Sequence, residues 1–300
     1  MGFLSPTEKQ EVRGMADKRR CDLHTHSCFS DGTYTPTKLV KQAESLGLSA
    51  LALTDHNTTG GLSEFMEAGR NSSVITVPGC EFSTEYQGKE VHVVGLFFKE
   101  KYWPEVDDFL ELTNIAKHNS NLRMIDSLKA RGYDVSYDEA AALTESGEFN
   151  RAHVAKVLMT KGYVGSVKEA FDTLLKEGNG IYTPAKRITS VAAIRFIKAF
   201  GAAAVIAHPL LNLTYGELNE FLPKAKNSGL DAIETRYTEY DEEMRYAADL
   251  LAEKFELKRS GGSDFHGENK PGIQLGSGRG DLIVPHEFYE DMRACSSYDD

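Results

Sequence analysis

Short apolar segments that end on histidine or a carboxylate recur along the chain and alternate with amphipathic segments of helical period. The clearest is residues 21–23, which lead into His24 and His26. Side chains at i and i+2 of a strand lie on one face, so a single cation can meet both imidazoles. Asp31 follows in a turn closed by Gly32, where the chain can fold back to the same point. Two histidines and a carboxylate without a cysteine pair suit Zn, Mn or Fe.

The same arrangement is expected at later strands. We expect these strands over residues 49–53, 74–77, 90–98, 202–207, 231–234 and 257–260. Side chains of metal-ligand type lie within or soon after them, namely His56, Glu81, His92, His208, Asp264 and His266. Taken singly, each could be a hydrogen-bonded histidine or an ordinary carboxylate. Their recurrence at strand ends favours one shared site, because active sites of parallel-stranded barrels form at the C-terminal ends of the strands.

Residues 101–177 interrupt this alternation with segments that are largely helical. We expect an all-helical insertion domain there, lying over the site, between the two parts of a barrel domain at 17–100 and 178–300. Outside the insertion, helices are expected over 37–46, 58–70, 190–200 and 244–255. Because the alternation resumes after the insertion, the barrel core should not depend on it. Residues 1–16 are expected to form a flexible tail.

The start of one insertion helix has the composition of a phosphate clamp. Asn150 can cap a helix that begins with Arg151 and carries His153. The backbone N–H groups of a helix N-terminus and a guanidinium fork both favour phosphate oxygens. A solvated first turn is the alternative. Lys186, where the chain returns to the barrel, is a weaker candidate for a substrate contact, with exposure on a loop as the favoured alternative.

Charge and hydropathy restrict the class of partner. Lys and Arg number 34 against 45 Asp and Glu, a net charge of −11. This balance argues against a general polyanion-binding surface and a long nucleic-acid duplex, and it fits a small anionic substrate better. No segment is apolar for long enough to cross a bilayer, and the first twenty residues lack the apolar core of a signal peptide. We therefore expect a cytoplasmic protein without a membrane partner.

The joint spacing of these motifs resembles the PHP (polymerase and histidinol phosphatase) phosphoesterases. The resemblance runs from about residue 21 to 276, and is carried by H-T-H-S-x-x-S-D-G at 24–32, T-D-H at 54–56, the isolated Glu81 and His92, A-H-P at 207–209 and G-S-D-F-H at 262–266. It is closest to the stand-alone branch with an inserted helical domain, which includes nucleoside phosphatases. The resemblance implies a distorted seven-stranded (β/α) barrel. It also implies two or three divalent metal ions (Mn, Zn or Fe), held by His24, His26, Asp31, His56, Glu81, His92, His208, Asp264 and His266.

The chemistry implied by this ligand set is phosphate-ester hydrolysis. Adjacent divalent ions lower the pKa of a bridging water, so that hydroxide exists near neutral pH, and they neutralise the phosphoryl oxygens. Glu81 and Asp264 are suited to bridge two ions, because a carboxylate has two oxygens. Arg151 would hold the phosphate, and His153 would bind it or protonate the leaving oxygen.

The expected function is a phosphoesterase acting on a small phosphorylated substrate. A nucleotide is expected: a nucleoside monophosphate, a 3′,5′-bisphosphate or a cyclic phosphate. The main alternative is a C–N hydrolase of the amidohydrolase type, which also uses metals at barrel strand ends. A non-catalytic metal-binding or proofreading accessory module is a third possibility. The phosphate-ready Arg151 and His153 favour the phosphoesterase.

Overall fold

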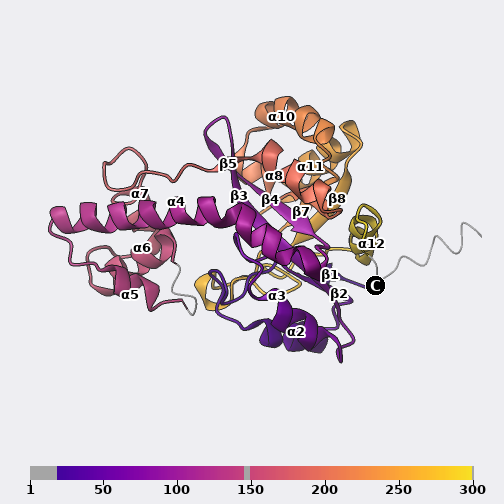
Figure 1. The fold of residues 1–300 in the computed structure, drawn as a ribbon, viewed down its shortest axis with the longest axis horizontal. Coiled ribbons are helices and arrows are strands. Elements are labelled where there is room, and N and C mark those ends of the chain that lie inside the picture. Colours follow the sequence, from indigo (N-terminus) through magenta and orange to yellow (C-terminus); the bar gives the residue numbers. More distant parts are fainter. Residues whose placement is uncertain (1–18, 145–148, 299–300) are drawn as a thin grey trace, which may run out of the picture.

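The computed structural model describes residues 19–144 and 149–298, and its centre is a nearly closed barrel of seven strands (Figure 1). In spatial order these strands are β1 (Cys21–Asp22), β2 (Ala50–Leu53), β3 (Ile75–Tyr86), β4 (Lys89–Leu96), β6 (Ala203–Ile206), β7 (Ala232–Tyr237) and β8 (Lys258–Gly262). A short β5 (Ile188–Thr189) pairs beside β3. β4 runs antiparallel to both of its neighbours, and the other pairs are parallel. The expected distorted seven-stranded barrel is therefore confirmed.

The barrel closes where β8 meets β1. The Leu23 N–H donates to the Gly261 carbonyl at 3.2 Å, and Thr25 pairs in parallel with Phe265. A Cβ atom at Gly262 would overlap the backbone of His24, so only glycine allows the two segments to approach this closely. The closure places the segment that carries the first two histidines beside the segment that follows β8.

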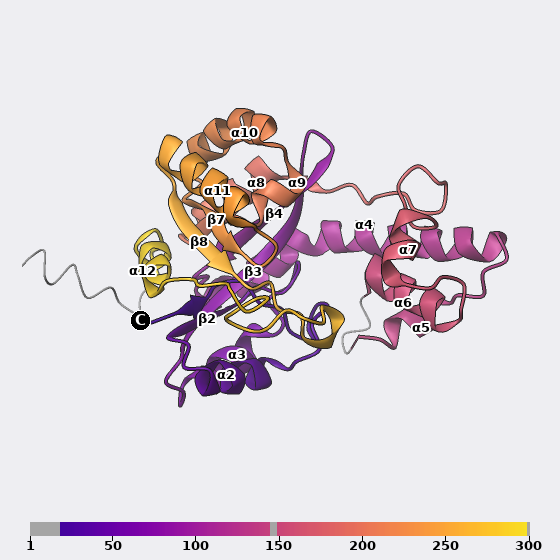
Figure 2. The ribbon, with the colours of Figure 1, turned by 180° about the vertical axis from the view of Figure 1, so that it is seen from behind.

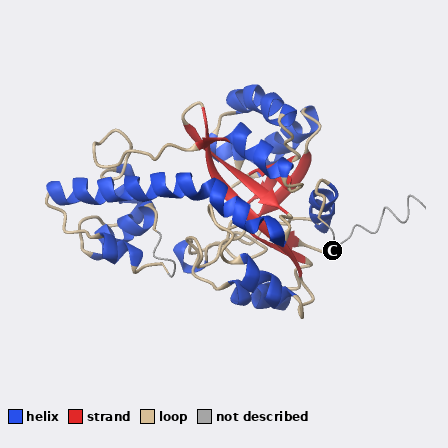
Figure 3. Cartoon of the chain, viewed as in Figure 1, coloured by secondary structure: helices blue, strands red, loops and turns tan. Residues whose placement is uncertain are grey.

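Helices surround the barrel, as the enclosed strands of Figure 3 show. These helices are α2 (Pro36–Ser45), α3 (Leu62–Gly69), α8 (Ser190–Ala199), α9 (Pro209–Asn212), α10 (Tyr215–Asn227), α11 (Glu242–Lys254) and α12 (His286–Ala294). Local sequence sets their starts. In α2, the Thr35 hydroxyl accepts from the Lys38 N–H, and Pro36 occupies the first turn, where its missing N–H costs nothing. Residues 210–230 and 286–294 were not predicted to contain helices.

The strand expected at 74–77 is longer than predicted. Pro78 and Gly79 indicated its end, yet β3 continues to Tyr86. Pairing on both sides explains this: Leu53 of β2 pairs with Pro78, and β4 pairs with the rest of β3 as a long antiparallel hairpin. Glu81 consequently lies inside a strand and not after one, which corrects the sequence-based placement.

The insertion holds α4 (Trp103–Ala130), α5 (Tyr137–Ala141), α6 (Arg151–Thr160) and α7 (Val167–Asp172). A short 3-10 turn (Glu100–Tyr102) precedes α4, which runs from the barrel to the far end of the insertion (Figures 1 and 2). The insertion has a hydrophobic core of its own, which includes Met124, Ile125, Leu128, Phe149, Val154 and Leu158.

The beginning of α4 belongs to the barrel. Trp103, Val106 and Leu110 are buried in the same hydrophobic cluster as the barrel side chains. The expectation that the barrel core is independent of residues 101–177 therefore needs correction, because these three side chains complete that core. Residues 101–177 as a separate domain remain a prediction.

Two expectations concern the chain as a whole. Among the described residues, no helix has the length and apolar character needed to span a membrane. The expected tail, residues 1–16, lies outside the described residues.

Candidate metal centre and substrate cleft

The nine side chains predicted as metal ligands converge at one end of the barrel. They form four overlapping groups, and within each group the candidate ligand atoms lie within 4.8 Å of one another. The groups are His26, Asp31, His56 and His266; His24, His26 and Asp264; His24, Glu81 and His208; and His56, Glu81 and His92. Because the groups share members, the cluster is continuous and could hold more than one cation.

The first motif is organised by its turn. His24 and His26 follow β1, and their Nε2 atoms lie 3.1 Å apart. The Gly32 N–H donates to the Ser27 carbonyl at 2.9 Å, and a Cβ at Gly32 would overlap the His26 backbone. The turn closed by Gly32 therefore folds back as expected. It places the Asp31 Oδ1 atom 3.1 Å from the Nε2 atom of His266, which follows β8.

Glu81 occupies the middle of the cluster. Its Oε1 atom lies 2.9 Å from His92 Nδ1 and 3.3 Å from His208 Nε2. Its Oε2 atom lies 2.9 Å from His56 Nδ1 and 3.3 Å from His24 Nε2. Both oxygens thus face imidazoles, the arrangement that a bridging carboxylate requires.

Asp264 is placed differently. Its Oδ1 atom faces the cluster, 3.1 Å from His26 Nε2. Its Oδ2 atom accepts from the Tyr237 hydroxyl at 2.8 Å and from the Lys270 ammonium at 2.6 Å. Only one oxygen of Asp264 is therefore directed at the cluster, so the two predicted bridging carboxylates are not equivalent.

The cluster is strongly polarised. Burial works against ionisation of Glu81, but the charges of His24 and His92 hold the pKa of this carboxyl well below its usual range. Burial lowers the pKa of His56 to about 4, which leaves its imidazole in the neutral form that binds metals. Burial also opposes protonation of His92, yet the charge of Glu81 raises the pKa of His92 to about 10.

Unsatisfied polar atoms indicate that the cluster suits a cation. Six buried side-chain nitrogen or oxygen atoms among the described residues make no hydrogen bond of good geometry, and four of them belong to this cluster, although His56 Nδ1 and Glu81 Oε2 lie 2.9 Å apart. These four are His26 Nδ1, Asp31 Oδ1, His56 Nδ1 and Glu81 Oε2. A buried polar atom without a partner is costly. Imidazole and carboxylate ligands without thiolates fit divalent Zn, Mn or Fe.

Two of the candidate ligands have a left-handed backbone. His208 has φ 31° and Asp264 has φ 55°, values that non-glycine residues seldom adopt. Such conformations each cost on the order of 1–3 kcal/mol and persist where the surroundings enforce them. The surroundings here are visible: the His208 N–H donates to Glu234 Oε2 at 2.7 Å, and the Asp264 N–H donates to the His24 carbonyl at 2.9 Å.

A second layer of buried carboxylates holds the ligand loops, and two of its members, Asp22 and Glu234, were not identified from the sequence. Glu234 Oε1 lies 2.8 Å from His24 Nδ1, so its two oxygens tie the segments that follow β1 and β6. Asp22 accepts from the N–H and the hydroxyl of Ser263, which holds the segment after β8. A charged side chain inside an apolar strand is the signal that could have revealed Glu234, because it needs a buried partner.

Asp55 has a similar role in the first motif. Its Oδ1 atom accepts from the Ser27 N–H at 2.8 Å and from the Ser30 hydroxyl at 2.6 Å, and its Oδ2 atom accepts from the Ser27 hydroxyl at 2.6 Å. These bonds fix the loop between His26 and Asp31. Asp55 therefore positions ligands without facing the cluster itself.

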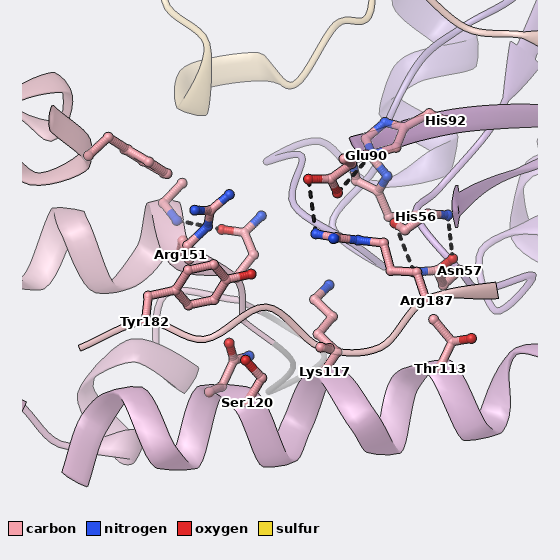
Figure 4. A pocket seen from close by; sticks show the side chains of 16 residues that line it. His56, Asn57, Glu90, His92, Thr113, Lys117, Ser120, Arg151, Tyr182 and Arg187 are labelled. Atoms are coloured by element: carbon pink, nitrogen blue, oxygen red, sulfur yellow. Dashed lines mark hydrogen bonds and ion pairs between the residues drawn. The ribbon is translucent and has the colours of Figure 1, made fainter. Parts of the chain in front are cut away.

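The insertion contributes a cavity of about 220 Å³ beside the cluster. Figure 4 shows Thr113, Lys117 and Ser120 directed into it from α4, opposite His56 and His92 of the metal cluster. The barrel and the insertion therefore share the walls of one cleft.

Arg151 and His153 lie at the start of α6, as predicted. The guanidinium of Arg151 stacks over the Tyr182 ring, 4.2 Å from its centroid, and lines the cavity (Figure 4). Asn150 caps the helix and also donates from its side-chain amide to Asp31 Oδ2 at 2.8 Å. One residue thus joins the expected phosphate clamp to the metal cluster.

His153 is oriented by the same cap. Its Nδ1 atom accepts from the Asn150 N–H at 3.1 Å. Burial lowers the pKa of His153, which favours the neutral ring. A neutral ring that accepts at Nδ1 carries its proton on Nε2 and can donate a hydrogen bond from there.

The structure does not bring Lys186 to the site. Lys186 is exposed and is absent from the cavity lining, to which its neighbours Ala185 and Arg187 contribute. Arg187 pairs with Glu90 at 2.9 Å (Figure 4). From this segment, Arg187 and not Lys186 therefore lines the cavity.

Comparison with known proteins gives consistent matches. A family model described as PHP domain matches residues 22–203. A 5′-3′ exoribonuclease of Haemophilus influenzae is 34% identical over 83% of this chain and 90% of its own length. A phosphoribosyl 1,2-cyclic phosphate 1,2-diphosphodiesterase of Eggerthella lenta is 30% identical over 82% of this chain and 94% of its own. A 3′,5′-nucleoside bisphosphate phosphatase of Chromobacterium violaceum is 29% identical over 85% and 90%.

Solved structures show the same architecture. A protein of Bifidobacterium adolescentis assigned as a metal-dependent phosphoesterase superposes with a TM-score of 0.82 at 26% identity, covering 94% of this chain and 98% of its own. An amidohydrolase of Chromobacterium violaceum, with bound sulfate and no metal, superposes with a TM-score of 0.79 at 27% identity, covering 92% and 96%. Both superpositions cover nearly the whole chain, so they include the insertion as well as the barrel.

Proposed function

The chain belongs to the PHP family, and on that premise we propose how its residues hydrolyse phosphate esters. It is a phosphoesterase, a hydrolase of phosphoric ester bonds. We propose a nucleotide as its substrate: a nucleoside monophosphate, a 3′,5′-bisphosphate or a cyclic phosphate. Two relatives support this choice by their names, one for a 3′,5′-nucleoside bisphosphate and one for a phosphoribosyl cyclic phosphate.

The strand-end cluster is our proposed metal centre. The nine side chains of the cluster would hold two or three divalent ions, with Mn, Zn or Fe as the candidates that fit imidazole and carboxylate ligands. When bound, such ions activate water and stabilise the charge that develops on the phosphoryl group. The residues of this chain keep the imidazoles oriented: Glu234 fixes His24, and Asp55 fixes the loop that bears Asp31.

The observation that carries the proposal is the charge of the cleft wall. Arg151 and Lys117 line the cavity beside the cluster, and neither forms an ion pair with a carboxylate within the described part of the chain. Cations that line a cavity without a carboxylate partner are free to bind an anionic ligand there. We propose that Arg151 grips the phosphoryl oxygens with its guanidinium fork, pre-oriented by its stacking on Tyr182.

His153 is proposed as a substrate-binding donor. Its Nε2–H can donate to a phosphoryl oxygen, while its Nδ1 stays engaged with Asn150. Protonation of the leaving oxygen, the second role considered for His153, would require the cationic ring, and the lowered pKa disfavours that form. Lys186 stays a weaker candidate, since it would have to reorient from its exposed position to reach the substrate.

A direct comparison of substrates tests the function. We expect hydrolysis of phosphate esters from a panel that includes nucleoside monophosphates, bisphosphates and cyclic phosphates, with Mn, Zn or Fe supplied in turn. An amide panel under the same conditions tests the C–N hydrolase alternative. Turnover of amides without turnover of any phosphate ester would overturn the assignment of phosphate binding to Arg151. The same metal series tests the proposed ions, and the cytoplasmic location stays a prediction.

A further inference from the structure

A carboxylate lies in the wall of the cavity where Arg151 is proposed to hold phosphate. Glu90 is the one Asp or Glu among the described residues that line this cavity. It belongs to β4, and 33% of its side chain is exposed. A carboxylate repels a phosphate group, so Glu90 would weaken substrate binding here unless its charge is compensated.

Glu90 contacts a candidate metal ligand. It precedes His92 by two positions in β4, and side chains at i and i+2 of a strand share one face. Glu90 Oε1 lies 3.2 Å from His92 Nε2, while His92 Nδ1 lies 2.9 Å from Glu81 Oε1 in the cluster. An imidazole that turns one nitrogen toward a metal site commonly gives its other N–H to a carboxylate, which fixes the ring. Glu90 therefore orients a ligand and, by doing so, brings a negative charge into the cavity.

Arg187 compensates that charge. Its guanidinium lies 2.9 Å from Glu90 Oε2, the oxygen that does not face His92, and only 13% of the Arg187 side chain is exposed (Figure 4). The backbone beside Arg187 is held to the barrel, because β5 begins at Ile188, which pairs with Thr84 of β3. A guanidinium stays protonated in proteins, so this compensation is always present.

The ion pair also lies between two cavities. A second cavity, of about 360 Å³, shares three lining residues with the substrate cavity, namely Glu90, Ala185 and Arg187. Two further carboxylates, Glu85 and Glu177, line the second cavity, and neither forms a salt bridge in the part of the chain that the structure describes. Lys89 lines it too, but its ammonium is paired with Glu217 at 2.6 Å. Arg187 is thus the cation that separates the substrate cavity from this acidic region.

From these observations we propose that Arg187 is a specificity-determining residue that acts through Glu90. By neutralising this carboxylate, it allows a phosphate dianion to bind beside the metal cluster. The inference rests on the proposed function and specifies which charge of phosphate the site accepts. Electrostatic energy scales with the charge of the ligand, so an uncompensated Glu90 repels a dianionic monoester twice as strongly as a monoanionic diester. Loss of Arg187 would therefore shift the preference of the site from monoesters toward diesters.

Two small inhibitors that differ in charge test the inference. At about pH 8, methyl phosphate is a dianion and dimethyl phosphate is a monoanion. We would measure the inhibition constant Ki of each against the best phosphate-ester substrate of the metal-loaded enzyme, in the parent, Arg187→Ala, Glu90→Gln and the double variant. Glu90→Gln keeps an oxygen that can accept from His92. Arg279→Ala is the matched control, because Arg279 pairs with Glu239 at 3.2 Å and neither residue lines the cavity.

We expect Arg187→Ala to raise Ki about tenfold for methyl phosphate and about threefold for dimethyl phosphate, because halving the charge of the ligand takes the square root of the factor. The double variant should bring both constants back to within about twofold of the parent values, since the carboxylate that needs compensation is gone. Glu90→Gln alone should not weaken the binding of methyl phosphate. Arg279→Ala should change neither constant.

Two results would overturn the inference and leave the proposed function standing. If the double variant binds methyl phosphate as weakly as Arg187→Ala does, Arg187 contacts the phosphate itself and does not act through Glu90. If Arg187→Ala changes the two constants by the same factor, or changes neither, the charge of the ligand is not what Arg187 controls. A parent enzyme that hydrolyses no phosphate ester would instead overturn the proposed function, and the inference with it.

Discussion

Removal of residues 101–177 should unfold the barrel, although the sequence suggests that the insertion is dispensable. The deletion would take away Trp103, Val106 and Leu110, which are buried in the barrel core at the start of α4. It would also remove Asp107, which accepts from the N–H and the hydroxyl of Thr59. A shorter deletion, residues 117–177, keeps all of these contacts and removes most of the insertion's own core.

The expected loss follows from burial. Each of the three apolar side chains contributes about 1.5–3 kcal/mol relative to exposure, so their removal costs about 5–9 kcal/mol. The free energy of unfolding of a whole domain is about 5–15 kcal/mol. The longer deletion therefore removes at least about a third of the stability of the barrel, and all of it if that stability lies in the lower part of this range. The shorter deletion should leave a folded barrel.

Urea unfolding followed by circular dichroism measures the free energy of unfolding of the two deletion variants, in each of which a short Gly-Ser linker joins the cut ends. We expect a cooperative transition only for the shorter deletion. Two point variants serve as a matched pair in the full chain: Leu110→Ala, at a buried position, should cost about 2–5 kcal/mol, and Leu112→Ala, 77% exposed on the same helix, about 0.5 kcal/mol or less. Equal midpoints for the two deletions would refute the assignment of α4 to the barrel core.

Three further predictions concern the site. His24→Ala or Asp264→Ala should remove bound metal and lower turnover by orders of magnitude while unfolding stays cooperative; full metal content by elemental analysis would contradict the ligand assignment. Arg151→Ala should keep its metal content but lose about 2–4 kcal/mol of transition-state binding, which is about 30-fold to 1,000-fold in kcat/KM. Arg151→Lys should recover part of the lost kcat/KM, and Ala at the exposed Arg123 should leave kcat/KM unchanged as the control. Glu234→Gln leaves one acceptor oxygen where the carboxylate uses two, so metal affinity should fall about 10-fold to 100-fold. Competition with a chelator measures this affinity, and an unchanged value would show that Glu234 does not orient the ligands.

The convergence of the candidate ligands could be predicted because it depends on local rules. Parallel strands bring their C-terminal ends to one side of a barrel, and i, i+2 spacing puts His24 beside His26 whatever the rest of the fold does. The cap at Asn150 was predictable for the same reason, since a side chain two or three residues from its partner N–H needs no tertiary information.

Features that depend on distant partners could not be predicted in this way. Pro78 and Gly79 are strand breakers by local preference, and pairing with β2 and β4 overrides them. The apolar side chains of α4 have one helical period throughout, yet those near Trp103 pack on the barrel and those near Met124 pack in the insertion. Sequence periodicity shows that a face is buried and not what covers it.

Because α4 belongs to both the barrel and the insertion, the width of the cleft depends on how the start of α4 packs against the barrel. A helix of 28 residues is about 42 Å long, so a tilt of about 3° at the barrel end moves the far end by about 2 Å. One wall of the cleft is formed by three α4 side chains, Thr113, Lys117 and Ser120. The helix would tilt about its start, where Trp103 packs in the barrel core, and we call this point the pivot. Substitutions that enlarge or shrink the pivot would therefore widen or narrow the space for substrate from a distance, so related chains could acquire different substrate lengths without a change in any residue that touches the substrate.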